Sequence, residues 1–308
     1  QTSTYHSFVG GAEANVSVSL ARFGHSVEMI SAVSDNQLGT SVVAALNSHG
    51  VGTQSIMSKN GRMGLYFLET GAVRRPSRII YDRAESVFSQ CSSEDFDWLP
   101  LLENTGHVHI SGITPATGPG PSALSQELAT ACSELNVSLS FDGNYRRSLW
   151  DSWNGDGPGV IREILAGAQT AFINERDIAL LLGSQFASRR EAIDHAFDTF
   201  PKLKRIAATR RLQSSVTNQQ LIGELHTRES VFTSRPHNLP GVVDRIGGGD
   251  AFAAGILHGV LSAAPPQYTV DFATAAAAIK HSIPGDFNLT TIEEVEEAMS
   301  EESLDVRR

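Results

Sequence analysis

The chain has 308 residues, 41% of them hydrophobic, which is enough to bury the core of one large α/β domain or of two modest ones. Its net charge of −10 argues against nucleic-acid or anionic membrane surfaces as partners, and no apolar run approaches the roughly 18 residues that cross a bilayer. Two cysteines without a motif spacing indicate neither a disulfide framework nor a zinc site, so we expect a cytoplasmic protein.

The first part of the chain alternates helix and strand. Gly10 and Gly11 lead into a helix predicted to end at Gly24, followed by a strand over 27–33 and a second helix over 39–49. Asn15 lies in the first turn of the first helix, beside the glycine pair, where the backbone leaves room for a ligand. The alternative is a plain glycine entry to the helix with Asn15 facing solvent.

Between residues 55 and 83 the pattern changes to short strands with no helix between them, which predicts a small antiparallel sheet. The expected strands are 54–57, 64–69 and 77–83. Alternation puts Tyr81 and Arg83 on one face of the last strand, and Tyr66 on its neighbour can add a hydroxyl. Arginine binds a carboxylate with two charge-assisted hydrogen bonds, so this face suits a ligand that carries a carboxylate. The alternative is a solvated Arg83 and two tyrosines buried in a dimer contact.

After residue 86 the alternation of strand and helix resumes, with strands predicted over 107–112, 137–142, 171–177 and 205–209. Parallel α/β sheets bind ligands at the carboxyl ends of their strands. Polar side chains follow the last three of these strands: Asn144 and Arg146, then Asn174 and Asp177, then Thr209 and Arg211. For Arg146 an ordinary basic loop is the competing interpretation, and for Asn174 a plain helix cap.

Near the C-terminal end, Asp244-Arg-Ile-Gly-Gly-Gly-Asp-Ala-Phe252 runs into a buried helix rich in small residues. The bare backbone of Gly247, Gly248 and Gly249 at a helix N-terminus offers N–H groups to a phosphate. Asp250 beside that cradle suggests a base for phosphoryl transfer to a hydroxyl. The alternative is that Asp250 serves only as a helix N-cap.

This stretch resembles the signature of the ribokinase-like (PfkB) carbohydrate kinases, usually D-T-x-G-A-G-D-x-F. The Asp-Arg pair and the third glycine are similar to the 2-keto-3-deoxygluconate kinase variant. Further stretches agree with that subgroup over nearly the whole chain: Gly10-Gly-Ala-Glu-Ala-Asn-Val16, Gly64-Leu-Tyr-Phe-Leu68, Arg78-Ile-Ile-Tyr-Asp-Arg83, Phe141-Asp-Gly-Asn-Tyr-Arg146 and Lys280-His-Ser-Ile-Pro-Gly-Asp-Phe-Asn288.

The resemblance implies an α/β fold: a doubly wound, mainly parallel sheet with helices on both faces and a small antiparallel β lid. We expect residues 12–54 and 85–308 to form the α/β domain, and 1–11 and 55–84 the lid. Relatives begin with a strand that has no counterpart here, so we expect that strand to be absent from the sequence. In the family the lid often pairs with a second subunit, which implies a homo-oligomer.

The resemblance also implies an ATP- and Mg²⁺-dependent kinase that phosphorylates the terminal hydroxyl of 2-keto-3-deoxygluconate. Asp250 would be the base, and Gly247, Gly248 and Gly249 the anion hole. The implied substrate contacts are Gly10, Gly11, Asn15, Tyr66, Tyr81, Arg83, Arg146 and Asp286. The implied nucleotide and Mg²⁺ contacts are Asn144, Asn174, Asp177, Thr209 and Arg211, with no residue binding the metal directly.

Two positions depart from the subgroup pattern. Asp177 replaces the usual glutamate but is still a hard oxygen donor, and Arg210 replaces an apolar residue on the nucleotide side. These departures and the expected loss of the first strand leave a catalytically impaired sugar- or nucleotide-binding protein as an alternative. A kinase for a neutral ketose such as fructose is the alternative within the same class, and Asp286 can also be a simple turn aspartate.

Overall fold

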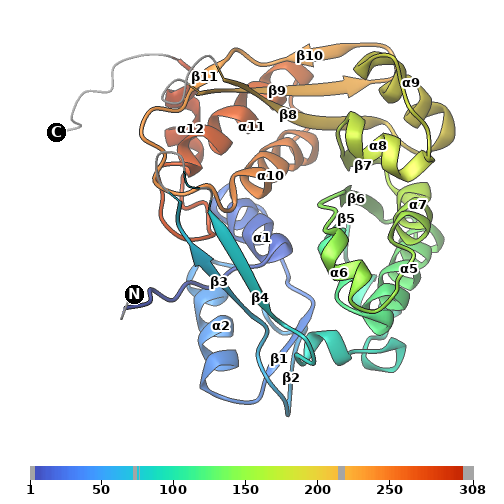
Figure 1. Cartoon of the computed structure of the whole chain (residues 1–308), viewed down its shortest axis with the longest axis vertical. Helices are drawn as coiled ribbons and strands as arrows, with labels where there is room; N and C mark the ends of the chain where they lie inside the picture. Colours follow the sequence, from blue (N-terminus) through green and yellow to red (C-terminus); the bar gives the residue numbers. More distant parts are fainter. Residues whose placement is uncertain (1–3, 72–74, 76, 214–218, 301–308) are drawn as a thin grey trace.

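The computed structural model of the chain describes residues 4–71, 75, 77–213 and 219–300 (Figure 1). Its largest sheet has the strand order β10-β9-β8-β7-β6-β5, with β11 also paired to β9. The strands are β5 (His107–Ser111), β6 (Ser138–Asp142), β7 (Thr170–Phe172), β8 (Arg205–Gln213), β9 (Gln219–Thr227), β10 (Val231–Thr233) and β11 (His237–Asn238). Pairing is parallel from β5 to β8 and antiparallel among β8, β9, β10 and β11.

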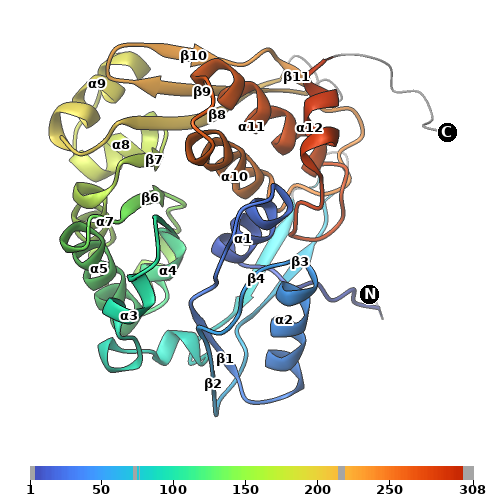
Figure 2. The ribbon, with the colours of Figure 1, turned by 180° about the vertical axis from the view of Figure 1, so that it is seen from behind.

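Helices cover both faces of this sheet, as Figures 1 and 2 show from opposite sides. One set is α3 (Trp98–Leu102), α4 (Ile113–Ala116), α5 (Pro119–Glu134), α6 (Arg147–Asp151), α7 (Gly157–Gly167), α8 (Glu175–Leu182) and α9 (Arg189–Thr199). The other is α1 (Ala12–Arg22), α10 (Gly248–Leu261), α11 (Pro266–Lys280) and α12 (Ile292–Met299). The expected doubly wound, mainly parallel fold is confirmed.

Strand alternation explains the two layers. Ile206 in β8 packs into the core that holds α5, α7, α8 and α9, whereas its neighbour Ala207 packs into the core that holds α1, α10 and α11. Successive side chains of a strand point to opposite faces, so one strand contributes to both cores. Both faces of the sheet are therefore dry, as parallel sheets require.

Helix α10 lies close against α11 because small residues meet at their contact. A Cβ atom built on Gly255 would be 2.4 Å from the Cα of Ala273, and one built on Gly259 would be 2.3 Å from Oγ1 of Thr269. Neither position has room for a side chain, so backbone packs directly on backbone or on a short side chain. This contact fixes α10 and, with it, the glycine loop at its start.

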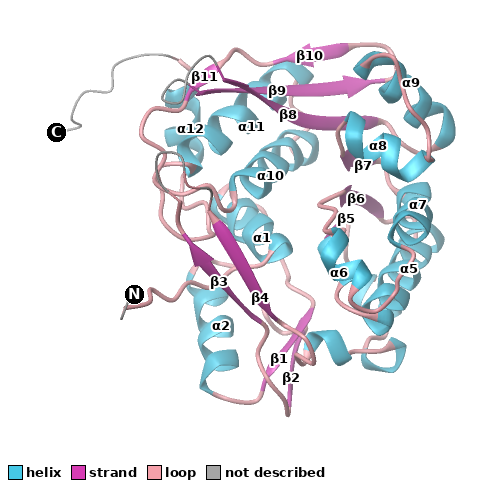
Figure 3. Cartoon of the chain, viewed as in Figure 1, coloured by secondary structure: helices cyan, strands magenta, loops and turns pink. Residues whose placement is uncertain are grey.

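The N-terminal part forms two further small sheets (Figure 3). Strand β1 (Ser31–Ser34) precedes α2 (Gln37–Ser48) and pairs in parallel with β2 (Ile56–Lys59). Strands β3 (Leu65–Glu69) and β4 (Arg78–Asp82) form the expected antiparallel hairpin. The prediction that the strand near residue 56 would join an antiparallel lid sheet was wrong, since β2 runs parallel to β1.

Other boundaries shift only slightly. The strand predicted over 27–33 is confined to Ser31–Ser34, with an isolated bridge between Glu28 and Gly52. Strand β8 continues past the predicted end at Thr209 to Gln213 and pairs with β9. The division of the chain into α/β domain and lid stays a prediction.

Candidate active site

A cavity of about 1200 Å³ lies where α1, the start of α10, the β3–β4 hairpin and the end of β6 converge. All the residues predicted to contact the substrate line it: Gly10, Gly11, Asn15, Tyr66, Tyr81, Arg83, Arg146 and Asp286. The predicted base Asp250, two glycines predicted for the anion hole, Gly247 and Gly249, and the predicted nucleotide-side residue Asn144 line it as well. The cavity also extends between β1 and β5, which are not paired with each other.

The start of α10 has the geometry that its glycines predict. Gly247 is the N-cap, in the left-handed region at φ 75°, and a Cβ there would be 2.1 Å from the carbonyl oxygen of Asp286. Gly248 packs against the His281 ring, while Gly249 is exposed with open space around its Cα. Asp250 is the third helical residue, so the alternative that it serves only as the N-cap is wrong.

Asp250 is held from the other end of the chain. Asn15 Nδ2 donates a hydrogen bond of 2.7 Å to Asp250 Oδ2, which joins the first turns of α1 and α10. Burial raises the pKa of Asp250 to about 7, and the charges of Glu13 and Asp286 add to the rise, whereas the Asn15 hydrogen bond and Arg146 oppose it. A carboxyl with its pKa near neutrality can accept a proton during catalysis.

Asn15 has a second polar atom at this place. Its Oδ1 is buried and accepts no hydrogen bond from any residue that the structure describes. Buried polar atoms normally have a partner, and an exception points to a ligand group or a water molecule. Because Nδ2 of the same amide already binds Asp250, a hydroxyl that meets Oδ1 would lie close to the carboxylate.

The lid hairpin contributes three of the predicted residues. The Tyr66 hydroxyl donates to the carboxylate of Asp286, with oxygen distances of 2.6 and 2.7 Å. A Cβ on Gly10 would lie 2.0 Å from Asp286 Oδ2, so the first glycine of the pair gives this carboxylate its space. The guanidinium of Arg83 lies 4.3 Å from the centre of the Tyr81 ring, as expected for two residues on one strand face.

Among the described guanidinium groups that line the cavity, those of Arg83 and Arg146 lack a matching carboxylate. Neither Arg83 nor Arg146 forms an ion pair with any described residue. Burial lowers the pKa of Arg83, and the nearby charge of Arg146 lowers it further. Two cations that repel each other in a partly buried site gain most from an anionic ligand between them.

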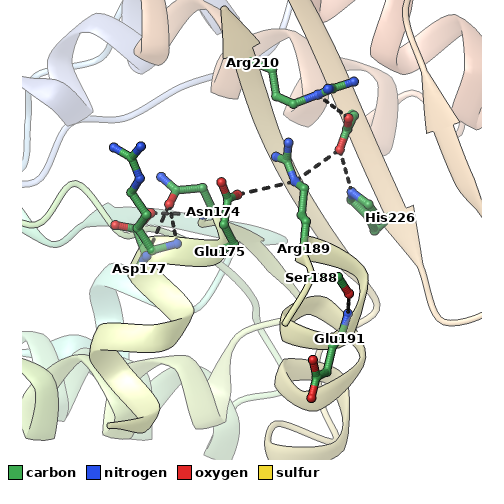
Figure 4. Close-up of polar contacts among 10 residues, drawn as sticks. Asn174, Glu175, Asp177, Ser188, Arg189, Glu191, Arg210 and His226 are labelled. Atoms are coloured by element: carbon green, nitrogen blue, oxygen red, sulfur yellow. Dashed lines mark hydrogen bonds and ion pairs between the residues drawn. The ribbon is translucent and has the colours of Figure 1, made fainter. Parts of the chain in front are cut away.

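Four of the five residues predicted for the nucleotide and Mg²⁺ lie outside this cavity, whereas the fifth, Asn144, lines it. Asn174 caps α8, accepting from the Asp177 backbone N–H at 3.2 Å, while Asp177 Oδ2 accepts from the Asn174 backbone N–H at 2.9 Å (Figure 4). Arg211 contacts His281 through a 2.9 Å Nη2 to Nε2 distance. The structure thus brings the substrate-side residues together and leaves Asn174, Asp177, Thr209 and Arg211 outside the cavity.

The unusual Arg210 is tied into an ion-pair cluster on β9. Its Nε lies 2.6 Å from Glu224 Oε1, and the other oxygen of Glu224 lies 3.1 Å from His226 and 3.3 Å from Arg189 (Figure 4). Arg189 also reaches Glu175 at 3.5 Å. Glu224 is buried, and its pKa is lowered mainly by the hydrogen bond from His226 and further by the charges of Arg189 and Arg210. The extra charge at position 210 is therefore matched by a carboxylate.

Three site residues were not predicted. Glu13 Oε1 accepts from the Ser111 backbone and hydroxyl at 2.8 and 3.0 Å, which joins α1 to the end of β5. Asp142 lies at the end of β6, and burial, followed by the charges of Asp250 and Asp177, raises its pKa to about 8. Lys280 is fully buried beneath the glycine loop. Glu13 follows the glycine pair and Asp142 ends a buried strand, which are the signals that would have found them.

A family model described as "pfkB family carbohydrate kinase" matches residues 1–290 of the chain. The chain belongs to this family. It is therefore a carbohydrate kinase, a phosphotransferase, and the resemblance drawn from the sequence is confirmed. Among the described residues, no helix is long and apolar enough to span a bilayer.

Similar proteins cover most of this pfkB chain. A 2-dehydro-3-deoxygalactonokinase of Haloferax volcanii is 27% identical over 94% of this chain and 86% of its own length. A 5-dehydro-2-deoxygluconokinase of Clostridium beijerinckii is 28% identical over 98% of this chain and 87% of its own. The crystal structure of the 2-dehydro-3-deoxygluconokinase of Thermotoga maritima is 32% identical, with a TM-score of 0.91, over 97% of this chain and 93% of that one.

Proposed function

We propose that this kinase transfers the γ-phosphoryl group of ATP to the terminal hydroxyl of a sugar acid, with 2-keto-3-deoxygluconate as the acceptor. One observation carries the proposal: Asp250, the open glycine backbone and two unpaired guanidinium groups line one cavity. The carboxylate and amides suit phosphoryl transfer, and the guanidinium groups suit an acidic acceptor. The three similar proteins are named as kinases of deoxy sugar acids, which agrees with this choice.

Asp250 takes the proton of the acceptor hydroxyl while the hydroxyl oxygen forms a bond to the γ-phosphorus of ATP. The bond between the γ-phosphorus and the bridging oxygen breaks, and ADP is released. The N–H groups of the Gly247–Gly249 backbone stabilise negative charge on the transferring group, by an amount on the order of a few kcal/mol for each donor. Asn15 orients Asp250 through its 2.7 Å hydrogen bond and offers Oδ1 to a substrate hydroxyl.

The residues near the phosphate end fit a water-bound Mg²⁺. Asp142 and Asp177 are close enough for the charge of Asp177 to raise the pKa of Asp142. Burial also raises the pKa of Asp177, so both oxygen donors gain from added positive charge. We infer that these two carboxyl groups hold the ion through its water ligands. When bound with ATP, the ion neutralises phosphate charge.

The raised pKa of Asp250 predicts a pH profile. A general base works only when ionised, so kcat/KM should rise with pH through about 7 and level off above it. Initial rates with saturating ATP and varied sugar, measured between about pH 5 and 9, test this, because kcat/KM for the sugar reports the groups of the enzyme before the sugar binds. A profile that stays flat across neutrality would contradict the assignment of Asp250 as the base.

We also propose that the lid hairpin joins two copies of the chain. Its outer face carries Leu65, Phe67 and Ile80, which are 39%, 43% and 62% exposed. Phe67 pairs with Ile80 across the hairpin, so these side chains form one apolar patch. Such patches on a two-stranded sheet favour association.

Ile80→Lys should therefore convert a wild-type dimer into a monomer in sedimentation velocity. Leu99→Lys is the matched control, since Leu99 is similarly exposed at 64% but lies in α3, outside the lid. A wild-type monomer, or an Ile80→Lys variant that still sediments as a dimer, would refute the lid interface.

A further inference from the structure

Lys280 ends α11 with its side chain fully inside the protein. Its exposed fraction is 0%, and Nζ donates a 2.9 Å hydrogen bond to the backbone oxygen of Ile283, in the turn that follows the helix. Burying an ammonium group is costly unless charges and hydrogen bonds compensate it. A methionine of similar length would fill the same space without that free-energy cost, which indicates that the positive charge itself has a role.

The charge lies beneath the glycine loop. A Cβ built on Gly247 would be 3.1 Å from Cε of Lys280, so the lysine stem packs on the residue that caps α10. Burial lowers the pKa of Lys280, and the charges of Asp244, Asp286 and Asp250 act in the opposite direction, in that order. Carboxylates from both sides of the loop therefore favour the ammonium form.

The glycine loop is tied to the turn over residues 281–286 at several points. Asp244 Oδ1 accepts from the Ile246 backbone at 2.9 Å, and Oδ2 accepts from the Gly285 backbone at 3.0 Å. The backbone N–H groups of Val243 and Asp244 donate to the His281 oxygen at 2.9 and 3.2 Å. Lys280 stands inside this arrangement, where it contacts the turn through Ile283 and the loop through Gly247.

We propose that Lys280 is a positioning residue, a covalently attached cation that holds the glycine loop against the 281–286 turn and keeps its amides aimed at the phosphoryl group. The inference rests on the proposed role of the glycine amides in catalysis. It assigns the lysine no contact with substrate.

Lys280→Met tests this, because methionine keeps the volume and removes the charge. Arg22→Met is the matched control: Arg22 also donates to a backbone oxygen, that of Thr290 at 3.4 Å, and lies outside the glycine loop. In hydrogen exchange followed by mass spectrometry, we expect faster exchange over 244–249 and 281–286 in Lys280→Met only. We expect kcat to fall by about 100-fold, and the acid limb of kcat/KM to move to higher pH as Asp250 loses a nearby positive charge.

Unchanged exchange in Lys280→Met would overturn the inference, whatever its activity. Faster exchange with wild-type kcat and an unmoved acid limb would overturn its catalytic part, because that result describes a purely structural lysine. A wild-type enzyme that phosphorylates no sugar acid would refute the proposed substrate instead, and the exchange measurement would still decide the role of Lys280.

Discussion

Replacing Asp250 with asparagine is expected to lower kcat by roughly two to four orders of magnitude, the usual contribution of a general base. The amide is nearly isosteric and its oxygen can still accept the hydrogen bond from Asn15, so the fold should be unaffected. Steady-state rates and a thermal melt of the same preparation measure the two effects separately. A large loss of turnover with little change in Tm is the result that the site geometry predicts.

The control for Asp250→Asn is Asp271→Asn. Asp271 lies on α11 and accepts a hydrogen bond from Gln267 at 2.9 Å, so the substitution removes a carboxylate from a neighbouring helix outside the cavity. It should leave turnover unchanged. If Asp250→Asn retained turnover close to that of this control, the carboxylate would not be the base, and phosphoryl transfer would depend on positioning alone.

Arg146→Ala is expected to reduce kcat/KM for sugar acids by roughly 10- to 100-fold, since a hydrogen bond to a charged group contributes about 1.5–3 kcal/mol. Neutral sugars gain nothing from the guanidinium, so their weaker turnover should change little. The measurement is kcat/KM over a panel of sugar acids and neutral ketoses with a coupled assay for ADP. The selectivity ratio, rather than either rate alone, reports the contact with the carboxylate.

Arg147→Ala supplies the control for that experiment. Arg147 is the next residue along the chain and is exposed, but it does not line the cavity. It should therefore leave the ratio of acid to neutral turnover unaltered. Equal losses for acids and neutral sugars in Arg146→Ala would mean that Arg146 supports the site without recognising a carboxylate. A wild-type enzyme that prefers fructose to sugar acids would show that the proposed acceptor is wrong.

Local patterns predicted the helices and the catalytic loop because the signals lie within a few residues of one another. The glycine pair before α1 and the three glycines before Asp250 each determine a helix start through their own backbone freedom. The pairing of β2 with β1 could not be obtained this way. Strand β2 has four residues without clear alternation, so its partner depends on long-range packing.

The site shows the same limit. Asn15 and Asp250 were each singled out, but the hydrogen bond between them spans 235 positions, and no sequence pattern reports such a contact. Glu13 was missed because its partner Ser111 lies 98 positions away. In the sequence, Lys280 is the basic last residue of a helix, which is usually an exposed position. Only the three-dimensional structure shows that its side chain is buried.

The close approach of α10 and α11 has a consequence for turnover at a distance. A helix is stiff along its axis, so a displacement at Gly255 moves the whole rod, including the carboxylate that begins it. A single methyl group added there meets backbone atoms that cannot rotate away, and misplacing reacting groups by about 1 Å can cost on the order of 100-fold in rate. The alignment of the reacting atoms is therefore expected to depend on the small residues between α10 and α11, as well as on the groups proposed to contact the sugar.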